Sequence, residues 1–142
     1  YALHGCLVGS EMCIRDSSMD IPVIGIAAAA AREAALSGVP FAVVTSTPKL
    51  APSIDKIMRA ERDDTYLGCY TTEDDPLVLA SNSDALDYAL ITSCEIAKKA
   101  GAKRVIIGGG PLGQAAIRIS SQVKVPLIQP LVAACNEVTA LI

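Results

Sequence analysis

Residues 104–111 read Arg-Val-Ile-Ile-Gly-Gly-Gly-Pro, and this stretch indicates the class of fold. The run Arg104–Ile107 is apolar after its first residue, which is typical of a strand that is buried on both faces, and the glycines and proline end it in a turn. A pattern with high helix propensity then runs to about Gln122. A buried strand, a turn and a helix in this order predict one unit of a parallel α/β sheet.

Strand and helix patterns alternate on either side of this unit. Further strands are expected at 21–26, 41–45 and 127–129, and further helices at 27–37, around 54–58, at 83–100 and at 131–142. We find no internal repeat. The chain is therefore expected to have an α/β fold, a parallel sheet with helices on both faces.

Residues 63–76 are the one irregular stretch among these patterns. They include a weaker strand pattern at 65–70 and an acidic loop, Glu73–Pro76. Ser81 and Asp84 then have the spacing of a capping box. We expect Ser81 to cap the helix that follows.

Composition excludes several classes of protein. The chain has 142 residues, of which 51% are hydrophobic and 19% charged, with a net charge of −3, so it is too apolar to be disordered. No apolar run reaches the roughly 18 residues of a membrane span. No basic patch with interleaved aromatic residues suggests nucleic acid as a partner. We expect a cytoplasmic protein that binds a small molecule, neither a membrane nor nucleic acid, and that could form a homo-oligomer.

The cysteine pattern suggests neither a metal site nor a disulfide framework. The cysteines are Cys6, Cys13, Cys69, Cys94 and Cys135, none in a CxxC or CxxH spacing, and His4 is the only histidine. Cys94 and Cys135 lie on apolar helical stripes and are expected in the core. Cys69 lies near the acidic loop, which would raise its thiol pKa. No cysteine stands out as catalytic.

Two segments follow predicted strands at the carboxyl edge of the sheet, where open α/β sheets bind ligands. One holds the hydroxyls of Thr45, Ser46 and Thr47, and the other is the turn Gly108-Gly109-Gly110-Pro111. Together they could bind a carboxylate or a developing enolate, because free backbone N–H groups and hydroxyls donate to anions. Two other interpretations stay open: the hydroxyls could cap the next helix, and the glycines could serve a tight turn with close packing of strand against helix.

Residues 108–113 also spell the G-x-G-x-x-G pattern of dinucleotide-binding turns. That pattern needs an acidic residue about 20 positions later, at the end of the next strand, to hold the ribose. The residue at that place is Gln129, and the next acid is Glu137. We therefore expect no nucleotide cofactor, although a small-anion- or nucleotide-binding module remains an alternative.

The beginning of the chain has a pattern of its own. Residues 6–17, Cys-Leu-Val-Gly-Ser-Glu-Met-Cys-Ile-Arg-Asp-Ser, resemble a translated adapter from transposase-based sequencing-library preparation. Such segments are excluded from reasoning about the fold. We expect residues 1–18 to be non-native, the natural chain to be cut off upstream of about Ser18, and residues 19–142 to be a partial domain. A genuine surface extension is the alternative.

From Met19 onward the chain resembles a known superfamily. Ile21–Ile26 with its Ala-rich helix and Phe41–Thr45 are similar to the middle of the aspartate/glutamate/hydantoin racemases. Gly101–Leu112 and Val125–Ile128 resemble their C-terminal segment, the hydantoin racemase branch most of all. The resemblance implies two similar α/β halves with the active site between them, of which this chain would be a fragment, inactive alone.

The resemblance also implies a chemistry that needs no cofactor. One thiolate removes a proton next to a carbonyl or carboxylate, a second thiol returns one from the opposite face, and backbone donors hold the carbanion oxygens. In this chain the first thiol would lie upstream of Met19, and Gly109 stands at the second position, so the catalytic residues are unknown. Thr45 and Ser46 match hydroxyl positions that contact substrate in relatives, and the turn 108–111 is the expected source of backbone donors. A one-thiol decarboxylase or isomerase, or a non-catalytic relative, is the alternative.

Overall fold

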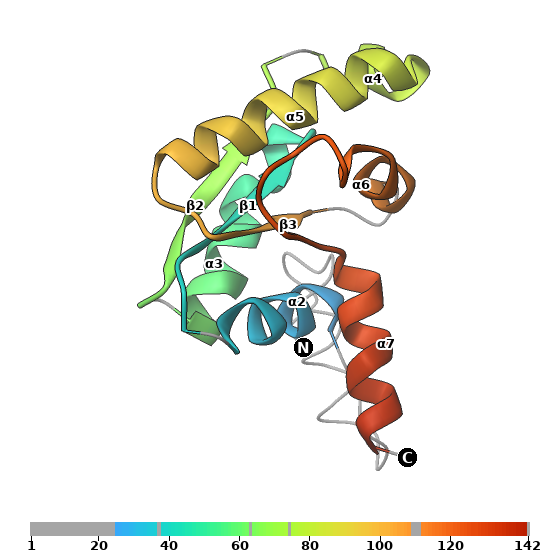
Figure 1. Cartoon of the computed structure of the whole chain (residues 1–142). Coiled ribbons are helices and arrows are strands. Elements are labelled where there is room, and N and C mark those ends of the chain that lie inside the picture. The colour runs from blue at the N-terminus through green and yellow to red at the C-terminus, as the bar shows by residue number, and fades with distance from the viewer. Residues whose placement is uncertain (1–24, 37, 63, 74, 109–111, 142) are drawn as a thin grey trace.

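The computed structural model describes residues 25–36, 38–62, 64–73, 75–108 and 112–141. Within them, four parallel strands form one sheet in the order β2-β1-β3-β4 (Figure 1). They are β1 (Phe41–Thr45), β2 (Tyr66–Thr71), β3 (Arg104–Ile107) and β4 (Leu127–Ile128). The expected α/β fold with a parallel sheet is confirmed, and the two central strands occupy the residues predicted for them.

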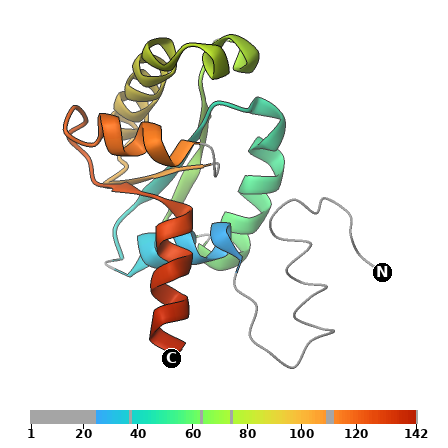
Figure 2. The ribbon, with the colours of Figure 1, turned by 90° about the vertical axis from the view of Figure 1, so that its right-hand side faces the viewer.

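Helices cover both faces of the sheet (Figures 1 and 2). One face carries α5 (Ser83–Lys99) and α6 (Gly113–Ile119), and the other carries α2 (Ile26–Ala35), α3 (Ala51–Arg62) and α7 (Pro130–Leu141). Two short helices, η1 (Pro48–Leu50) and α4 (Pro76–Ser81), follow β1 and β2. Most of the strand expected at 21–26 lies outside the described residues, and its last residue begins α2.

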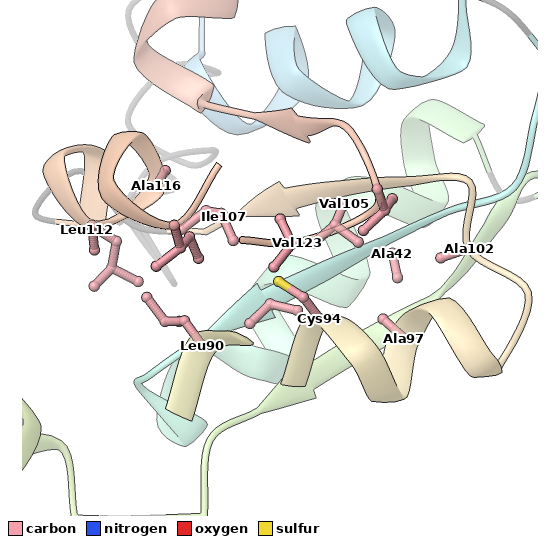
Figure 3. Close-up of a cluster of buried hydrophobic side chains, with 14 residues drawn as sticks. Ala42, Leu90, Cys94, Ala97, Ala102, Val105, Ile107, Leu112, Ala116 and Val123 are labelled. Atoms are coloured by element: carbon pink, nitrogen blue, oxygen red, sulfur yellow. The ribbon is translucent and has the colours of Figure 1, made fainter. Parts of the chain in front are cut away.

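Alternate residues of β1 and β3 point into two separate cores, as the pleat of a strand requires. Val44 and Ile107 pack toward α5 and α6, while Val43 and Ile106 pack toward α2, α3 and α7. Cys94 of α5 is fully buried in the first core, so its expected core position is confirmed (Figure 3). Burial, and secondly the carboxylate of Glu95, raises the pKa of this thiol to about 12.

The irregular stretch forms an edge strand followed by a helix that the sequence did not reveal. Gly68 has a φ of +145°, and the β1–β2 register shifts beside it, which explains the weak strand pattern. The acidic loop ends at Asp75, whose carboxylate accepts the N–H of Leu77 and so caps α4.

The cap predicted for α5 is wrong by one residue. Asn82 is the N-cap, and its side-chain oxygen accepts the N–H of Ala85. The hydroxyl of Ser81 instead donates to the carbonyl oxygen of Val78, within the last turn of α4. Because α4 ends where α5 begins, Ser81 belongs to the preceding helix.

The core position expected for Cys135 is also wrong. Cys135 lies on the outer side of α7 and is exposed, as are Leu131 and Val138 of the same helical stripe. The buried side of α7 instead carries Ala133 and Ala134, which pack beside the Ala-rich helix α2. Apolar periodicity identified the stripe, but it does not tell which side of an apolar helix faces the core.

An ion pair joins α7 to α2. Nε and Nη2 of Arg32 donate to the two carboxylate oxygens of Glu137 at 2.6 and 2.7 Å, and Nη1 lies 3.3 Å from the carboxylate of Glu61 on α3. This bidentate geometry is the strong form of a charge-assisted hydrogen bond. Chiefly through these hydrogen bonds, Arg32 lowers the pKa of Glu137.

We predict that Arg32→Met lowers the free energy of unfolding at pH 7 by about 1 kcal/mol, because the pair is bidentate but partly exposed. The folded-state pKa of Glu137 is depressed, so this contribution is present above its unfolded pKa and is lost as the pH falls through the folded pKa. Urea unfolding should therefore separate variant and parent at pH 7, and the difference should shrink steadily as the pH is lowered through the acidic range. Lys56→Met, which removes an exposed cation from α3, is the control for net charge. Equal stability of the Arg32 variant and its parent at pH 7 would contradict the prediction.

Candidate functional site

The ends of three neighbouring strands meet at the carboxyl edge of the sheet. The N–H of Gly108, directly after β3, donates to the carbonyl oxygen of Val44 on β1 at 2.7 Å. The N–H of Thr72, directly after β2, donates to the carbonyl oxygen of Thr45 at 3.1 Å. The hydroxyl segment and the start of the glycine turn are therefore side by side. Of the remaining residues predicted for this site, Gly109, Gly110 and Pro111 lie outside the described residues.

The hydroxyl of Thr45 already has one local role. Its side chain is almost fully buried, and Oγ1 accepts the N–H of Thr47 at 3.3 Å, so it supports the turn toward η1. A hydroxyl that accepts through one lone pair can still donate its proton. Ser46 is half-buried at the same corner and is the more accessible of the two hydroxyls. The N-cap of η1 is Thr47, for which the structure shows no side-chain cap hydrogen bond, so the bond to Thr45 supports a turn rather than capping a helix. This turn role is compatible with a binding role at Thr45.

Thr72 is a polar residue at this edge that the sequence did not single out. Its side chain is 3% exposed, and among the described residues Oγ1 has no hydrogen-bond partner. A buried polar group without a partner costs about 1–3 kcal/mol, so such groups are rare. The sequence contained a signal for this residue, because Thr71-Thr72 stands at the end of β2 as Thr45-Ser46 stands at the end of β1. Thr72 was not singled out because the sequence pattern around β2 is irregular and the end of this strand was uncertain.

Close packing explains why residue 108 is a glycine. A Cβ at this position would lie 3.0 Å from Cγ1 of Val43 and 3.6 Å from Cδ1 of Ile54. Val43 is itself fully buried and cannot move aside. The end of β3 therefore passes close to β1 and α3, which agrees with the close-packing interpretation of this glycine.

Gln129 borders the site from the fourth strand. It follows β4 directly, and its Oε1 lies 3.5 Å from the place where a Cβ on Gly113 would stand, at the start of α6. An uncharged amide at this point can donate and accept hydrogen bonds but cannot act as a base. The carboxyl edge is thus lined by hydroxyl, amide and backbone groups that suit the binding of a carboxylate or carbonyl oxygen.

The described cysteines lie away from this edge. Cys69 is in β2 and packs toward α3, where burial, and secondly the carboxylate of Asp55, raises the pKa of its thiol to about 12. The expected direction of that shift is confirmed, but burial and Asp55 cause it rather than the acidic loop. Cys94 is in the core and Cys135 is on the surface of α7. Among the described residues, then, the edge can hold an anion but has no thiol to move a proton.

Two further findings concern the described part of the chain as a whole. No cluster of three or more histidine, cysteine, aspartate or glutamate side chains that could hold a metal ion occurs within it. No helix there is long and apolar enough to cross a membrane.

Comparisons with known proteins agree with this geometry. The family model described as Asp/Glu/Hydantoin racemase matches residues 14–138. Among curated proteins, nothing matches the chain. Among solved structures, an allantoin racemase from Pseudomonas fluorescens is similar with a TM-score of 0.76 at 22% identity, over 87% of this chain and 53% of that chain.

Two more solved structures resemble the chain. An allantoin racemase from Klebsiella pneumoniae gives a TM-score of 0.71 at 25% identity, over 84% of this chain and 50% of that one. A glutamate racemase from Bacillus anthracis gives 0.69 at 13% identity, over 93% of this chain and 53% of that one. The chain spans about half the length of each structure.

We predict that Gly108→Ala destabilises the protein by about 1–3 kcal/mol, because the added methyl group overpacks a rigid core against Val43. Gly113→Ala is the matched control: among the described residues its Cβ would meet only Gln129 Oε1 at an ordinary 3.5 Å, and alanine favours a helix. Urea unfolding of both variants measures the difference. If both substitutions were equally tolerated, the close approach of β3 to β1 would not constrain residue 108.

The three described cysteines should differ sharply in reactivity. At pH 8 a thiol reagent such as iodoacetamide should modify the exposed Cys135 rapidly, and Cys69 and Cys94 only slowly, because the thiolate is the nucleophile and burial suppresses it. Mass spectrometry of proteolytic peptides distinguishes the sites, and denatured protein gives the unprotected rates. Modification of Cys69 at the rate of Cys135 would show that β2 and α3 separate readily.

Proposed function

The chain belongs to the Asp/Glu/hydantoin racemase family, and from this premise we propose that the protein moves a proton at a carbon next to a carbonyl or carboxylate. The proposed reaction is racemisation or isomerisation without a cofactor. The proposed substrate is a small hydantoin- or amino-acid-like molecule. Because the chain spans about half of the racemases that it resembles, we propose that this activity belongs to the longer protein rather than to these residues alone.

The observation that carries this proposal is the meeting of Thr45 and Gly108 at adjoining strand ends. A carbanion next to a carbonyl places negative charge on oxygen, and preorganised donors that face that oxygen lower the barrier. Thr45 keeps a hydroxyl proton to donate, Ser46 is within reach of solvent, and the glycine turn begins at the neighbouring strand. In this proposal the edge binds the substrate oxygens.

The group that moves the proton must then come from elsewhere. Gly109 stands where the resemblance places a thiol, and no described cysteine lies at the edge. This favours a second candidate, a relative with one thiol, which would exchange a proton from one side only. A non-catalytic module that binds a small anion with the same groups is the third.

A deuterium-exchange experiment separates these candidates. The upstream part of the gene is restored to give a chain of racemase length, and enantiopure 5-substituted hydantoin, allantoin, glutamate or aspartate is incubated in D₂O. Proton NMR measures exchange at the stereogenic carbon, and circular dichroism measures racemisation. Two-sided chemistry gives both, one-sided chemistry gives exchange with retained configuration, and a binding module gives neither.

Substitutions in this chain test the residues. Thr45→Val and Ser46→Ala should each lower kcat/KM about 10- to 100-fold, the value of one hydrogen bond to a charged group. Thr92→Val, a hydroxyl on the outer side of α5, is the control and should leave kcat/KM unchanged. If exchange is one-sided, Gly109→Cys should add racemisation. Full activity of the Thr45 and Ser46 variants would remove this edge from the substrate site.

A further inference from the structure

Gln129 is a polar residue at the carboxyl edge whose side-chain amide has no hydrogen-bond partner among the described residues. It stands between β4 and α7, and its carbonyl oxygen accepts the N–H of Ala133 at 3.0 Å, so its backbone begins α7. Residues at this place are usually Ser, Thr, Asp or Asn, whose short side chains accept a backbone N–H of the helix. The amide of Gln129 makes no such bond. Helix capping therefore does not explain this side chain.

The side chain of Gln129 extends along the edge of the sheet toward the glycine turn. β4 pairs in parallel with β3, and the register of Ile106 with Ile128 places Gln129 next to the end of β3 (Figure 1). Oε1 of Gln129 lies 3.5 Å from the place of a Cβ on Gly113, the first residue of α6, which follows that turn. Gln129 is half-buried, and its amide atoms are not among the enclosed polar atoms of the described chain. A ligand at this edge can therefore reach the amide.

The surroundings of this amide are polar but uncharged. The residues that directly follow the four strands are all uncharged: Ser46, Thr72, Gly108 and Gln129. The charged residues that come next along the chain after β1 and β2 are Lys49 and Glu73, and both are exposed. A charged substrate group at the strand ends would lose hydration without gaining an ion pair from these four residues. The edge therefore favours an uncharged polar group beside Gln129.

A glutamine side chain binds a cyclic amide through two hydrogen bonds. Nε2 donates and Oε1 accepts, so a carbonyl oxygen and the N–H next to it can pair with both atoms at once. Glutamine and asparagine read the donor–acceptor edge of adenine in this way. A carboxylate would use only Nε2 and bring its second oxygen against Oε1, and an ammonium group would use only Oε1. Gln129 can therefore distinguish a cyclic amide from a free amino acid.

We propose that Gln129 is a specificity-determining residue, which selects substrates that carry a cyclic amide next to the reacting carbon. Its Nε2 donates to the carbonyl oxygen of that amide, and its Oε1 accepts the adjacent N–H. This inference rests on the proposed function, because it uses the same edge of the sheet. It goes further by assigning the choice between hydantoin-like and amino-acid-like substrates to one side chain.

Binding of two unreactive analogues tests this assignment without catalysis. 5,5-Dimethylhydantoin and 2-aminoisobutyrate share the same dimethyl-substituted carbon, but the first offers a cyclic amide and the second a carboxylate and an ammonium group. Isothermal titration calorimetry with the chain of racemase length should give the lower Kd for 5,5-dimethylhydantoin. Tighter binding of 2-aminoisobutyrate, or no binding of 5,5-dimethylhydantoin, would overturn the inference.

Two substitutions of Gln129 test the two hydrogen bonds in the same titrations. Gln129→Met should raise the Kd of 5,5-dimethylhydantoin about tenfold or more, because both bonds are lost. Gln129→Glu should raise it as well and, unlike Gln129→Met, lower the Kd of 2-aminoisobutyrate, since a carboxylate attracts the ammonium group. Gln122→Glu, an exposed glutamine beyond the other end of α6, is the matched control and should leave both Kd values unchanged. Equal Kd values for Gln129→Met and the parent would refute the role of Gln129, and Tm shows that each variant is folded.

Methylation of a reactive substrate tests the bond to Oε1 during turnover. A 5-substituted hydantoin that is methylated on the nitrogen between its two carbonyl groups lacks the N–H that Oε1 would accept. In the deuterium-exchange assay, Gln129→Met should therefore lower kcat/KM less for the methylated hydantoin than for the unmethylated one. Equal losses for the two substrates would overturn the inference. Absence of exchange by the parent would contradict the proposed function instead, and the titrations would still decide the role of Gln129.

Discussion

The parallel pairing of β1 with β3 is the constraint on which the rest of the structure depends. The two strands pair from Phe41 with Arg104 to Val44 with Ile107, although a strand and several helices separate them along the chain. Parallel strands need long crossovers, so every helix between them is placed by this pairing. The same register sets Gly108 beside Val44 and brings the candidate binding groups to one edge. Fold and site therefore rest on one set of hydrogen bonds.

Much of the fold could be predicted because buried parallel strands have a distinctive composition. The runs at 41–45 and 104–107 are apolar except for Thr45 and Arg104 at their ends, since both faces of each strand are covered. Helix boundaries that depend on a single capping hydrogen bond were harder to predict. Asp75 and Asn82 cap adjoining helices, whereas the capping-box spacing with Asp84 pointed to Ser81 instead of Asn82. Which side of α7 faces the core is determined by its packing against α2. The local sequence pattern of α7 does not reveal that contact.

The site could be predicted only in outline. The carboxyl ends of parallel strands share an edge, so Thr45 and Gly108 could be placed at one edge of the sheet from the sequence. That their strands are neighbours is a finding of the structure. Thr72 could not, because the bulge at Gly68 weakened the pattern of β2. The close approach of residue 108 to Ile54 could not be predicted from the sequence, since it depends on how α3 lies across the sheet. Sequence patterns identified where the strands end. Which groups at those ends can contact a ligand depends on the packing of the helices and strands.

The bulge in β2 has a consequence for how the chain behaves in a crowded solution. Among the described residues β2 pairs on one side only, so its other side presents backbone donors and acceptors to any extended chain nearby. A regular, flat edge of this kind is a template for aggregation. With Gly68 at φ +145° and the register shifted beside it, the edge cannot offer an unbroken ladder. The irregularity that weakened the strand pattern in the sequence thus disfavours aggregation by pairing of β2 with strands of other chains.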